Sequence, residues 1–179
     1  MNGIYIHIPF CRQACRYCDF YFTISTGLKK DFISALKREL GSGRSFPSEK
    51  EVSSVYFGGG TPSVLSCAET AEILSTVYKY YKISDQPEIT IEANPDDLEP
   101  AYLRGLAETG VNRLSIGIQS FDNVQLELMR RSHNAEKAIR SVSEAYNAGF
   151  ENISADLIYG IPGMTDRLWT ENLQKIFSL

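Results

Sequence analysis

The alternation of short apolar runs with longer stretches of helical spacing constrains the fold of this chain most. Five runs rich in β-branched residues have the length of strands, and they lie at residues 4–8, 53–57, 88–92, 113–118 and 152–158. Apolar residues recur every three or four positions in the stretches at residues 28–40, 66–81, 100–110, 124–129, 138–149 and 168–176. Strand and helix in five successive units predict an α/β fold with parallel strands inside and helices outside.

An unusual polar or glycine-rich segment follows each predicted strand. A cysteine loop follows the first strand, the sequence Gly-Gly-Gly-Thr-Pro follows the second, and the later strands end at or near Glu92, Gln119 and Asp156. The carboxyl ends of parallel strands meet at one edge of a sheet, where α/β proteins build their sites. We therefore expect these segments to form one functional site.

Three of the four cysteines fall within eight residues. Cys11, Cys15 and Cys18 have the spacing C-x3-C-x2-C, which leaves an odd thiol in any local disulfide pairing. Three thiolates from one loop suit an iron–sulfur cluster that keeps one iron open. The alternative is a structural zinc-binding module whose site is completed by His7 or Asp19. Cys67 stands alone at the start of a predicted helix, and we expect it to be structural.

The glycines at residues 58–60 do not match the common nucleotide-binding motifs. Residue 63 is serine where the dinucleotide fingerprint needs glycine, and no lysine follows as in a P-loop. Glycine backbone can nevertheless approach a ligand closely and offer N–H groups to a carboxylate. A tight turn without a ligand is the alternative.

Charge and hydropathy exclude some classes of partner. The 179 residues carry 18 basic and 22 acidic side chains, for a net charge of −4, which disfavours a whole-surface interaction with nucleic acid. No apolar run reaches the ~20 residues of a membrane span. The first ten residues show no basic leader, so we expect a cytoplasmic protein with no membrane span.

Five segments together resemble the radical S-adenosylmethionine (SAM) superfamily. They are residues 5–11 with the cysteine triplet, 56–63, 92–95, 113–122 and 156–163. Within the superfamily, the sequence is similar to the group that contains the heme chaperone HemW and oxygen-independent coproporphyrinogen III dehydrogenase. The resemblance implies a partial (β/α) barrel of radical SAM type, with five β-α units of an expected six.

The resemblance also implies roles for individual residues. Cys11, Cys15 and Cys18 would hold a [4Fe–4S] cluster whose open iron is chelated by SAM. The residues that would bind SAM or lie close to the cluster are Tyr5, Tyr17, Gly59, Gly60, Thr61, Glu92, Gln119, Arg131 and Asp156. Adjacent Arg130 could replace Arg131 after a small register shift.

One position separates the two branches of this group. Family dehydrogenases resemble C-x3-C-x2-C-x-C, and Phe20 occupies the place of the fourth cysteine here. The resemblance therefore favours a heme chaperone that delivers heme to an acceptor protein. Oxidative decarboxylation of coproporphyrinogen III is the alternative. The electron donor and the heme acceptor are not identified by the sequence.

Members of this group are about twice as long as this chain. We therefore expect residues 1–179 to be a radical SAM core domain, truncated before the sixth strand and the region that handles the tetrapyrrole. Heme or porphyrin is the expected ligand, but its binding residues cannot be assigned. His7 is expected beside the cluster, and His133 in a surface loop. Residues 41–50 form the one linker-like stretch.

Overall fold

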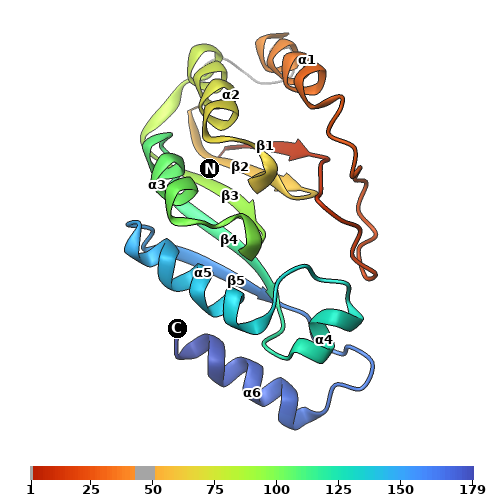
Figure 1. The fold of residues 1–179 in the computed structure, drawn as a ribbon. Coiled ribbons are helices and arrows are strands. Elements are labelled where there is room, and N and C mark those ends of the chain that lie inside the picture. The colour runs from red at the N-terminus through yellow and green to blue at the C-terminus, as the bar shows by residue number, and fades with distance from the viewer. Residues whose placement is uncertain (1, 43–50) are drawn as a thin grey trace.

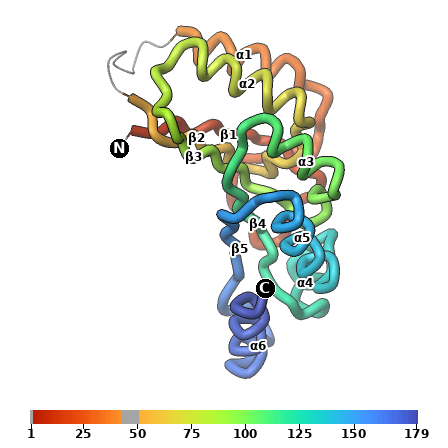
Figure 2. Tube along the Cα trace, turned by 90° about the vertical axis from the view of Figure 1, so that its left-hand side faces the viewer, coloured from red at the N-terminus to blue at the C-terminus, as the bar shows by residue number. Residues whose placement is uncertain are grey.

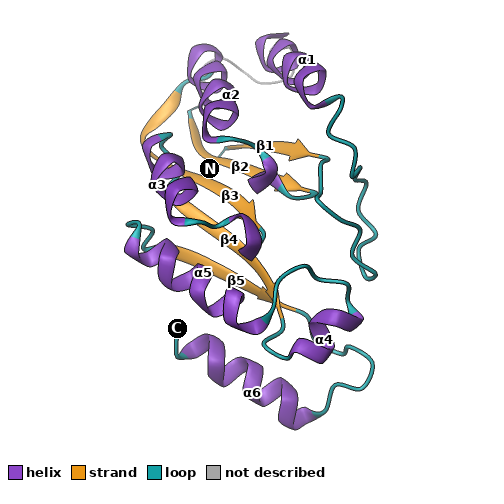
Figure 3. Cartoon of the chain, viewed as in Figure 1, coloured by secondary structure: helices purple, strands orange, loops and turns teal. Residues whose placement is uncertain are grey.

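The computed structural model describes residues 2–42 and 51–179, which form one parallel sheet with helices on its outer face (Figures 1 and 3). The strands are β1 (Gly3–Ile8), β2 (Val52–Gly59), β3 (Ile83–Ala93), β4 (Arg113–Gln119) and β5 (Asn152–Leu157), and they neighbour one another in chain order. The five predicted strands and their parallel arrangement are confirmed. Most of the predicted linker lies outside the described residues.

The helices follow the strands in the predicted order. They are α1 (Lys29–Ser42), α2 (Cys67–Tyr80), α3 (Pro100–Glu108), α4 (Asn123–Leu128), α5 (Ala135–Asn147) and α6 (Asp166–Phe177), with short 3-10 turns η1 (Pro62–Val64) and η2 (Pro95–Asp97). Ser66 and Glu69 form a capping box at the start of α2. Within the described residues, no helix is long and apolar enough to span a bilayer.

The sheet has one apolar face and one polar face. In β4, Leu114, Ile116 and Ile118 are fully buried, whereas the alternate positions carry Ser115 and Gly117. Successive side chains of a strand point to opposite faces, so this alternation separates the hydrophobic core from a polar surface. Helices α1, α2, α3 and α5 lie along the apolar face and contact one another in that order (Figure 2).

Strand β3 is longer than its apolar run predicts. The run covers residues 88–92, but the strand begins at Ile83, which pairs with Val52 before an irregularity shifts the register to Ser54 and Glu88. Backbone pairing therefore extends the strand through residues whose side chains give no strand pattern. The carboxyl end, which positions Glu92, lies where the sequence places it.

Candidate functional site

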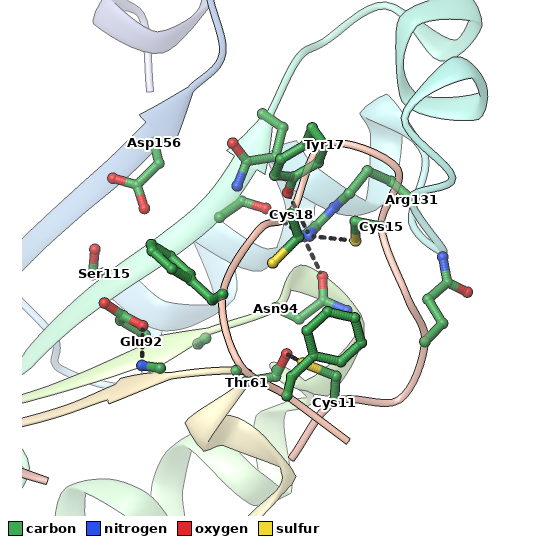
Figure 4. Close-up of a pocket in the computed structure, with 18 residues that line it drawn as sticks. Cys11, Cys15, Tyr17, Cys18, Thr61, Glu92, Asn94, Ser115, Arg131 and Asp156 are labelled. Atoms are coloured by element: carbon green, nitrogen blue, oxygen red, sulfur yellow. Dashed lines mark hydrogen bonds between the residues drawn. The ribbon is translucent and has the colours of Figure 1, made fainter. Parts of the chain in front are cut away.

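A pocket of about 190 Å³ lies at the carboxyl ends of the strands, between the polar face of the sheet and the cysteine loop (Figure 4). Glu92, Ser115 and Asp156 lie on one side of it, and the cysteines lie on the other. Its lining is Cys11, Gln13, Cys15, Tyr17, Cys18, Phe20, Phe22, Gly59, Gly60, Thr61, Glu92, Ala93, Asn94, Ser115, Gly117, Gln119, Arg131 and Asp156. Every residue singled out for the cofactors, except Tyr5, is therefore in one pocket.

The three loop thiols differ in exposure and contacts. Cys11 is buried, and its Sγ atom accepts a hydrogen bond from Thr61 Oγ1 at 3.4 Å. Burial raises the pKa of the Cys11 thiol, and the neighbouring thiols raise it further, although Thr61 and Arg131 act in the opposite direction. A cationic metal centre would stabilise the thiolate form that this burial disfavours.

The three thiols line the same pocket. Across residues 2–42 and 51–179, no three His, Cys, Asp or Glu side chains are grouped closely enough to hold a single metal ion. A tetrahedral zinc ion would draw its thiolates to within about 4 Å of one another. Three thiolates from one loop match the ligand set of a cluster that keeps one iron open.

Arg131 connects the cysteine loop to the sheet. Its guanidinium donates to Cys15 Sγ at 3.6 Å, to Tyr17 Oη at 3.2 Å, to Asn94 Oδ1 at 2.8 Å and to the Gly117 carbonyl at 2.7 Å. Its buried Nε has no hydrogen-bond partner among the described residues. A half-buried cation beside thiols suits an anionic ligand group such as a carboxylate.

Tyr17 remains protonated beside this arginine. Burial raises its pKa to about 12, and the Arg131 charge opposes that rise, while Cys15 contributes to it. The phenol therefore keeps its hydrogen-bond donor at neutral pH. Its ring also lines the pocket and offers an apolar face to a planar ligand group.

Two carboxylates lie on the sheet side of the pocket. Glu92 accepts hydrogen bonds from Tyr56 Oη at 2.9 Å and from the Gly59 backbone N–H at 3.1 Å. Loss of surrounding water raises the pKa of Glu92 and of Asp156, and the two negative charges reinforce the effect at Glu92. Such carboxylates are stabilised by ligand hydroxyls or an ammonium group, which a SAM molecule carries.

The glycine turn is required by close packing. Gly59 has a φ of +114°, and a Cβ atom there would lie 2.7 Å from the His7 ring. A Cβ at Gly60 would lie 2.8 Å from the Phe10 carbonyl oxygen and 2.9 Å from Cys11 Sγ. The turn therefore allows the cysteine loop to approach β2, in addition to leaving room for a ligand.

Gln119 ends β4 in a conformation that non-glycine residues rarely adopt. Its φ is +69°, and the register between β4 and β5 shifts between Gly117 and Gln119. Left-handed backbone at a polar residue with a side chain is strained and clusters at functional sites. Here it places the Gln119 side chain in the pocket lining.

Tyr5 and His7 lie beside the pocket. Neither lines it, although Tyr5 is expected close to the cluster. Tyr5 Oη is 3.2 Å from His7 Nδ1, and the Tyr5 ring stacks on Tyr56 with 6.0 Å between centroids. These residues form an aromatic group on the polar face of the sheet, next to Glu92.

The expectation that His133 lies in a surface loop is wrong. The residue is 4% exposed, and its Nε2 atom is 3.0 Å from the Ile118 carbonyl oxygen. Burial lowers the pKa of His133 to about 4, so the ring is neutral at physiological pH. The structural reason is that the loop after α4 folds back against the end of β4.

Cys67 begins α2, where its Sγ lies 3.5 Å from the Tyr102 carbonyl.

Sequence reasoning gave no role to several lining residues. Ser115 and Gly117 precede Gln119 at every second position of β4, so strand alternation could have identified them. Asn94 lies directly after β3 and accepts from Arg131. Only the tertiary structure pairs those two, because 37 residues separate them.

Comparisons with known proteins agree with this geometry. The model of the Radical SAM superfamily matches residues 5–176. The chain is 40% identical over 179 residues to the heme chaperone HemW of Lactococcus lactis, covering 99% of this chain and 46% of that protein. It is 38% identical over 182 residues to HemW of Bacillus subtilis, covering 100% of this chain and 48% of the relative.

A eukaryotic protein and a solved structure are also similar. The mouse radical S-adenosyl methionine domain-containing protein 1, mitochondrial, is 36% identical over 175 residues, covering 97% of this chain and 40% of that protein. Escherichia coli HemN, a coproporphyrinogen III oxidase described as a radical SAM enzyme, superposes with a TM-score of 0.89 at 28% identity, covering 99% of this chain and 42% of HemN. The chain thus spans about half the length of the curated relatives it matches.

Membership of this superfamily implies a [4Fe–4S] cluster and SAM, and the residues of the pocket fit both. Three thiols line one side, an arginine stands beside them, and two carboxylates face them across the pocket. The family model covers nearly the whole chain, from the first strand to the last helix. This chain belongs to the radical SAM superfamily.

Proposed function

We propose that residues 1–179 form one cofactor-binding domain in which Cys11, Cys15 and Cys18 hold a [4Fe–4S] cluster. SAM would bind between this loop and the sheet. When bound, the two cofactors supply one-electron cleavage of a sulfonium. The observation that carries the proposal is the presence of all three thiols in one pocket with Arg131, Glu92 and Asp156.

The protein residues would orient SAM and shield it. Arg131 would bind the SAM carboxylate, and Glu92 and Asp156 would accept from its ammonium and ribose hydroxyls. Gly59, Gly60, Thr61 and Gln119 would surround its methionine end, with Tyr17 beside the adenine. Tyr5 would lie close to the cofactors from beside the pocket, where its ring stacks on Tyr56.

We propose heme chaperone activity for the whole protein, with a heme or porphyrin ligand and a heme-acceptor protein as partners. The support is the 40% identity to a protein named as a heme chaperone. We further propose a cytoplasmic location, with no nucleic acid partner, in keeping with the net charge of −4. Subcellular fractionation tests this location, because the mouse relative carries a mitochondrial name.

The second candidate is oxidative decarboxylation of coproporphyrinogen III. The superposition on HemN, with a TM-score of 0.89, favours it. Phe20 argues against it, because this side chain stands in the pocket lining where the dehydrogenase pattern has a cysteine. Anaerobic turnover of coproporphyrinogen III by a protein that contains this chain would overturn the chaperone proposal.

Electron paramagnetic resonance on reconstituted, dithionite-reduced protein tests the cofactor proposal first. We expect a cluster signal that changes when SAM is added, because an open iron would take part in SAM binding. Heme titration, followed by absorption spectroscopy, then tests the chaperone proposal. Zinc without acid-labile sulfide would refute cluster binding, and a cluster with no heme binding in the whole protein would refute the chaperone.

A further inference from the structure

A buried carboxylate lies behind the cysteine loop, outside the pocket. Asp97 belongs to η2, and its side chain is 2% exposed. One carboxylate oxygen accepts from Arg12 Nε at 2.5 Å, and the other accepts from Ser63 Oγ at 2.6 Å. Both oxygens are therefore occupied, and both partners are residues that the cofactor proposal leaves without a role.

The partners of Asp97 belong to different segments of the site. Arg12 directly follows Cys11, and Ser63 follows Thr61 in the glycine turn. Ser63 Oγ also accepts from the Asn94 backbone N–H at 3.1 Å, at the end of β3. One carboxylate thus connects the segments that leave β1, β2 and β3.

This connection reaches two residues that line the pocket. Thr61 Oγ1 donates to Cys11 Sγ, and Asn94 Oδ1 accepts from Arg131. The far part of the cysteine loop is attached elsewhere: the Gln13 side chain donates to the Arg130 carbonyl, and the Arg16 backbone N–H donates to the Met129 carbonyl. At the near end, the Phe10 carbonyl accepts from the Thr61 backbone N–H at 2.8 Å, and the Asp97–Arg12 pair adds a side-chain attachment beside Cys11.

The geometry distinguishes this ion pair from an ordinary surface pair. Two exposed charges contribute little, because both side chains must be ordered and water screens them. Here Ser63 and burial fix the carboxylate in advance, so only Arg12, whose side chain is 63% exposed, has to be ordered. Removing either partner leaves a buried charge or a broken charge-assisted hydrogen bond.

We propose that Asp97 is a positioning residue that, through Arg12 and Ser63, holds the Cys11 end of the cysteine loop against β2 and β3. The importance of this attachment for the cluster rests on the proposed function. The attachment itself does not, because it is a property of the polypeptide alone. The two can therefore be tested separately.

Thiol labelling of the full 179-residue chain without added iron tests the attachment. Iodoacetamide modification is followed at each cysteine by mass spectrometry in the wild type, Asp97→Asn and Arg12→Gln. We expect Cys11 to react about tenfold faster in both variants, since loss of a charge-assisted hydrogen bond makes loop opening easier. Cys67 lies in α2, outside the cysteine loop, and serves as the internal control, because a higher labelling rate there would report general loosening of the structure.

Glu99→Gln is the matched control variant. Glu99 lies two residues from Asp97 and pairs with Lys137 at 2.5 Å, but it contacts no part of the cysteine loop in the described structure. Its Cys11 labelling rate should equal that of the wild type. Arg12→Gln keeps the test available if Asp97→Asn fails to fold, because the Arg12 side chain is largely exposed.

The double variant tests whether Asp97 and Arg12 act through each other. If they do, the double variant should label Cys11 no faster than the faster single variant. Additive effects, unchanged Cys11 labelling, or equal acceleration at Cys11 and Cys67 would each overturn the proposal. After reconstitution, iron and sulfide content should fall in Asp97→Asn but not in Glu99→Gln, and normal content in Asp97→Asn would refute the link to the cluster.

Discussion

Strands β4 and β5 are neighbours in the sheet, yet the surrounding structure covers them to very different degrees. In β4, Leu114, Ile116 and Ile118 are fully buried. No residue of β5 is buried, and α6, which follows it, buries only Asn172. By contrast, α2 buries five side chains of its own.

This difference divides the candidate site. The cysteine loop, the glycine turn and Glu92 are attached to β1, β2 and β3, whose apolar residues belong to the main core. Asp156 is attached to β5, where burial is partial. Local stability follows the apolar area that each segment buries, so in the 179-residue chain taken by itself we expect the cluster side of the site to be more rigid than the Asp156 side.

The sharpest test of this comparison is a matched pair of core truncations. Ile116→Ala removes a fully buried side chain and should lower the free energy of unfolding by about 2–5 kcal/mol. Ile153→Ala makes the same chemical change on half-buried β5 and should cost clearly less. Urea unfolding of both variants measures the difference. Equal losses would mean that β5 is as well supported as β4.

Gly60→Val tests how tightly the cluster side is packed. The new side chain would meet the Phe10 carbonyl and Cys11 Sγ, so we expect a loss of about 1–3 kcal/mol in stability, together with reduced iron incorporation. Gly27→Val is the control, because its nearest neighbour lies 3.8 Å away and its backbone is not left-handed. Thermal unfolding and iron analysis measure both variants. Equal stability and equal iron content in Gly60→Val and Gly27→Val would contradict the packing described.

Glu92→Gln and Asp156→Asn compare the two carboxylates directly. Glu92 is held by Tyr56 and by the Gly59 N–H, whereas Asp156 stands on an exposed position of β5. We expect Glu92→Gln to weaken SAM binding about tenfold, and Asp156→Asn to weaken it less. Calorimetric titration of cluster-loaded protein measures both affinities. A larger loss of SAM affinity in Asp156→Asn would mean that the Asp156 side of the site is the more rigid one.

The smallest expected effect concerns pH. The pKa of Glu92 is raised in the folded state by loss of water around it, with Tyr56, Gly59 and His7 opposing and Asp156 reinforcing the rise. A raised carboxyl pKa favours the folded state fully below the unfolded pKa, and the contribution disappears as pH rises through the folded value. Glu92→Gln should therefore make the free energy of unfolding less sensitive to pH at values above the ordinary carboxyl pKa.

Glu69 provides the control of opposite sign. Burial raises its pKa, but hydrogen bonds from Lys29 and Ser66 outweigh burial and lower it overall. Its contribution is present above the unfolded pKa and is lost as pH falls. Unfolding midpoints measured against pH should shift in opposite directions for Glu69→Gln and Glu92→Gln, and parallel shifts would contradict the environments described.

Much of the candidate site could be predicted because it follows from strand order. Glu92, Gln119 and Asp156 each end or nearly end a parallel strand, and parallel strands place their carboxyl ends together. The capping box at the start of α2 likewise depends on neighbours in sequence. Local patterns suffice wherever the determining contacts are local.

His133 and Asp97 show where local patterns fail. Both are polar residues in segments that look like solvent-exposed turns, yet both are buried by partners distant in sequence. His133 Nε2 contacts the Ile118 carbonyl, and Arg12 pairs with Asp97 although 85 residues separate them in sequence. No periodicity encodes such pairings, because they depend on how loops from different strands fold back over the sheet.

Strand and helix spacing predict the five β-α units, their parallel order and the chemical groups at one edge of the sheet. The position of Tyr5 beside the pocket, the bonds of Arg131 to Cys15 and Asn94, and the pairing of Arg12 with buried Asp97 emerge only in the folded chain. The two sets of features differ in the range of the contacts that produce them. Strand and helix patterns reflect burial along one segment, whereas hydrogen-bond partners between loops are fixed only when the whole sheet brings those loops together.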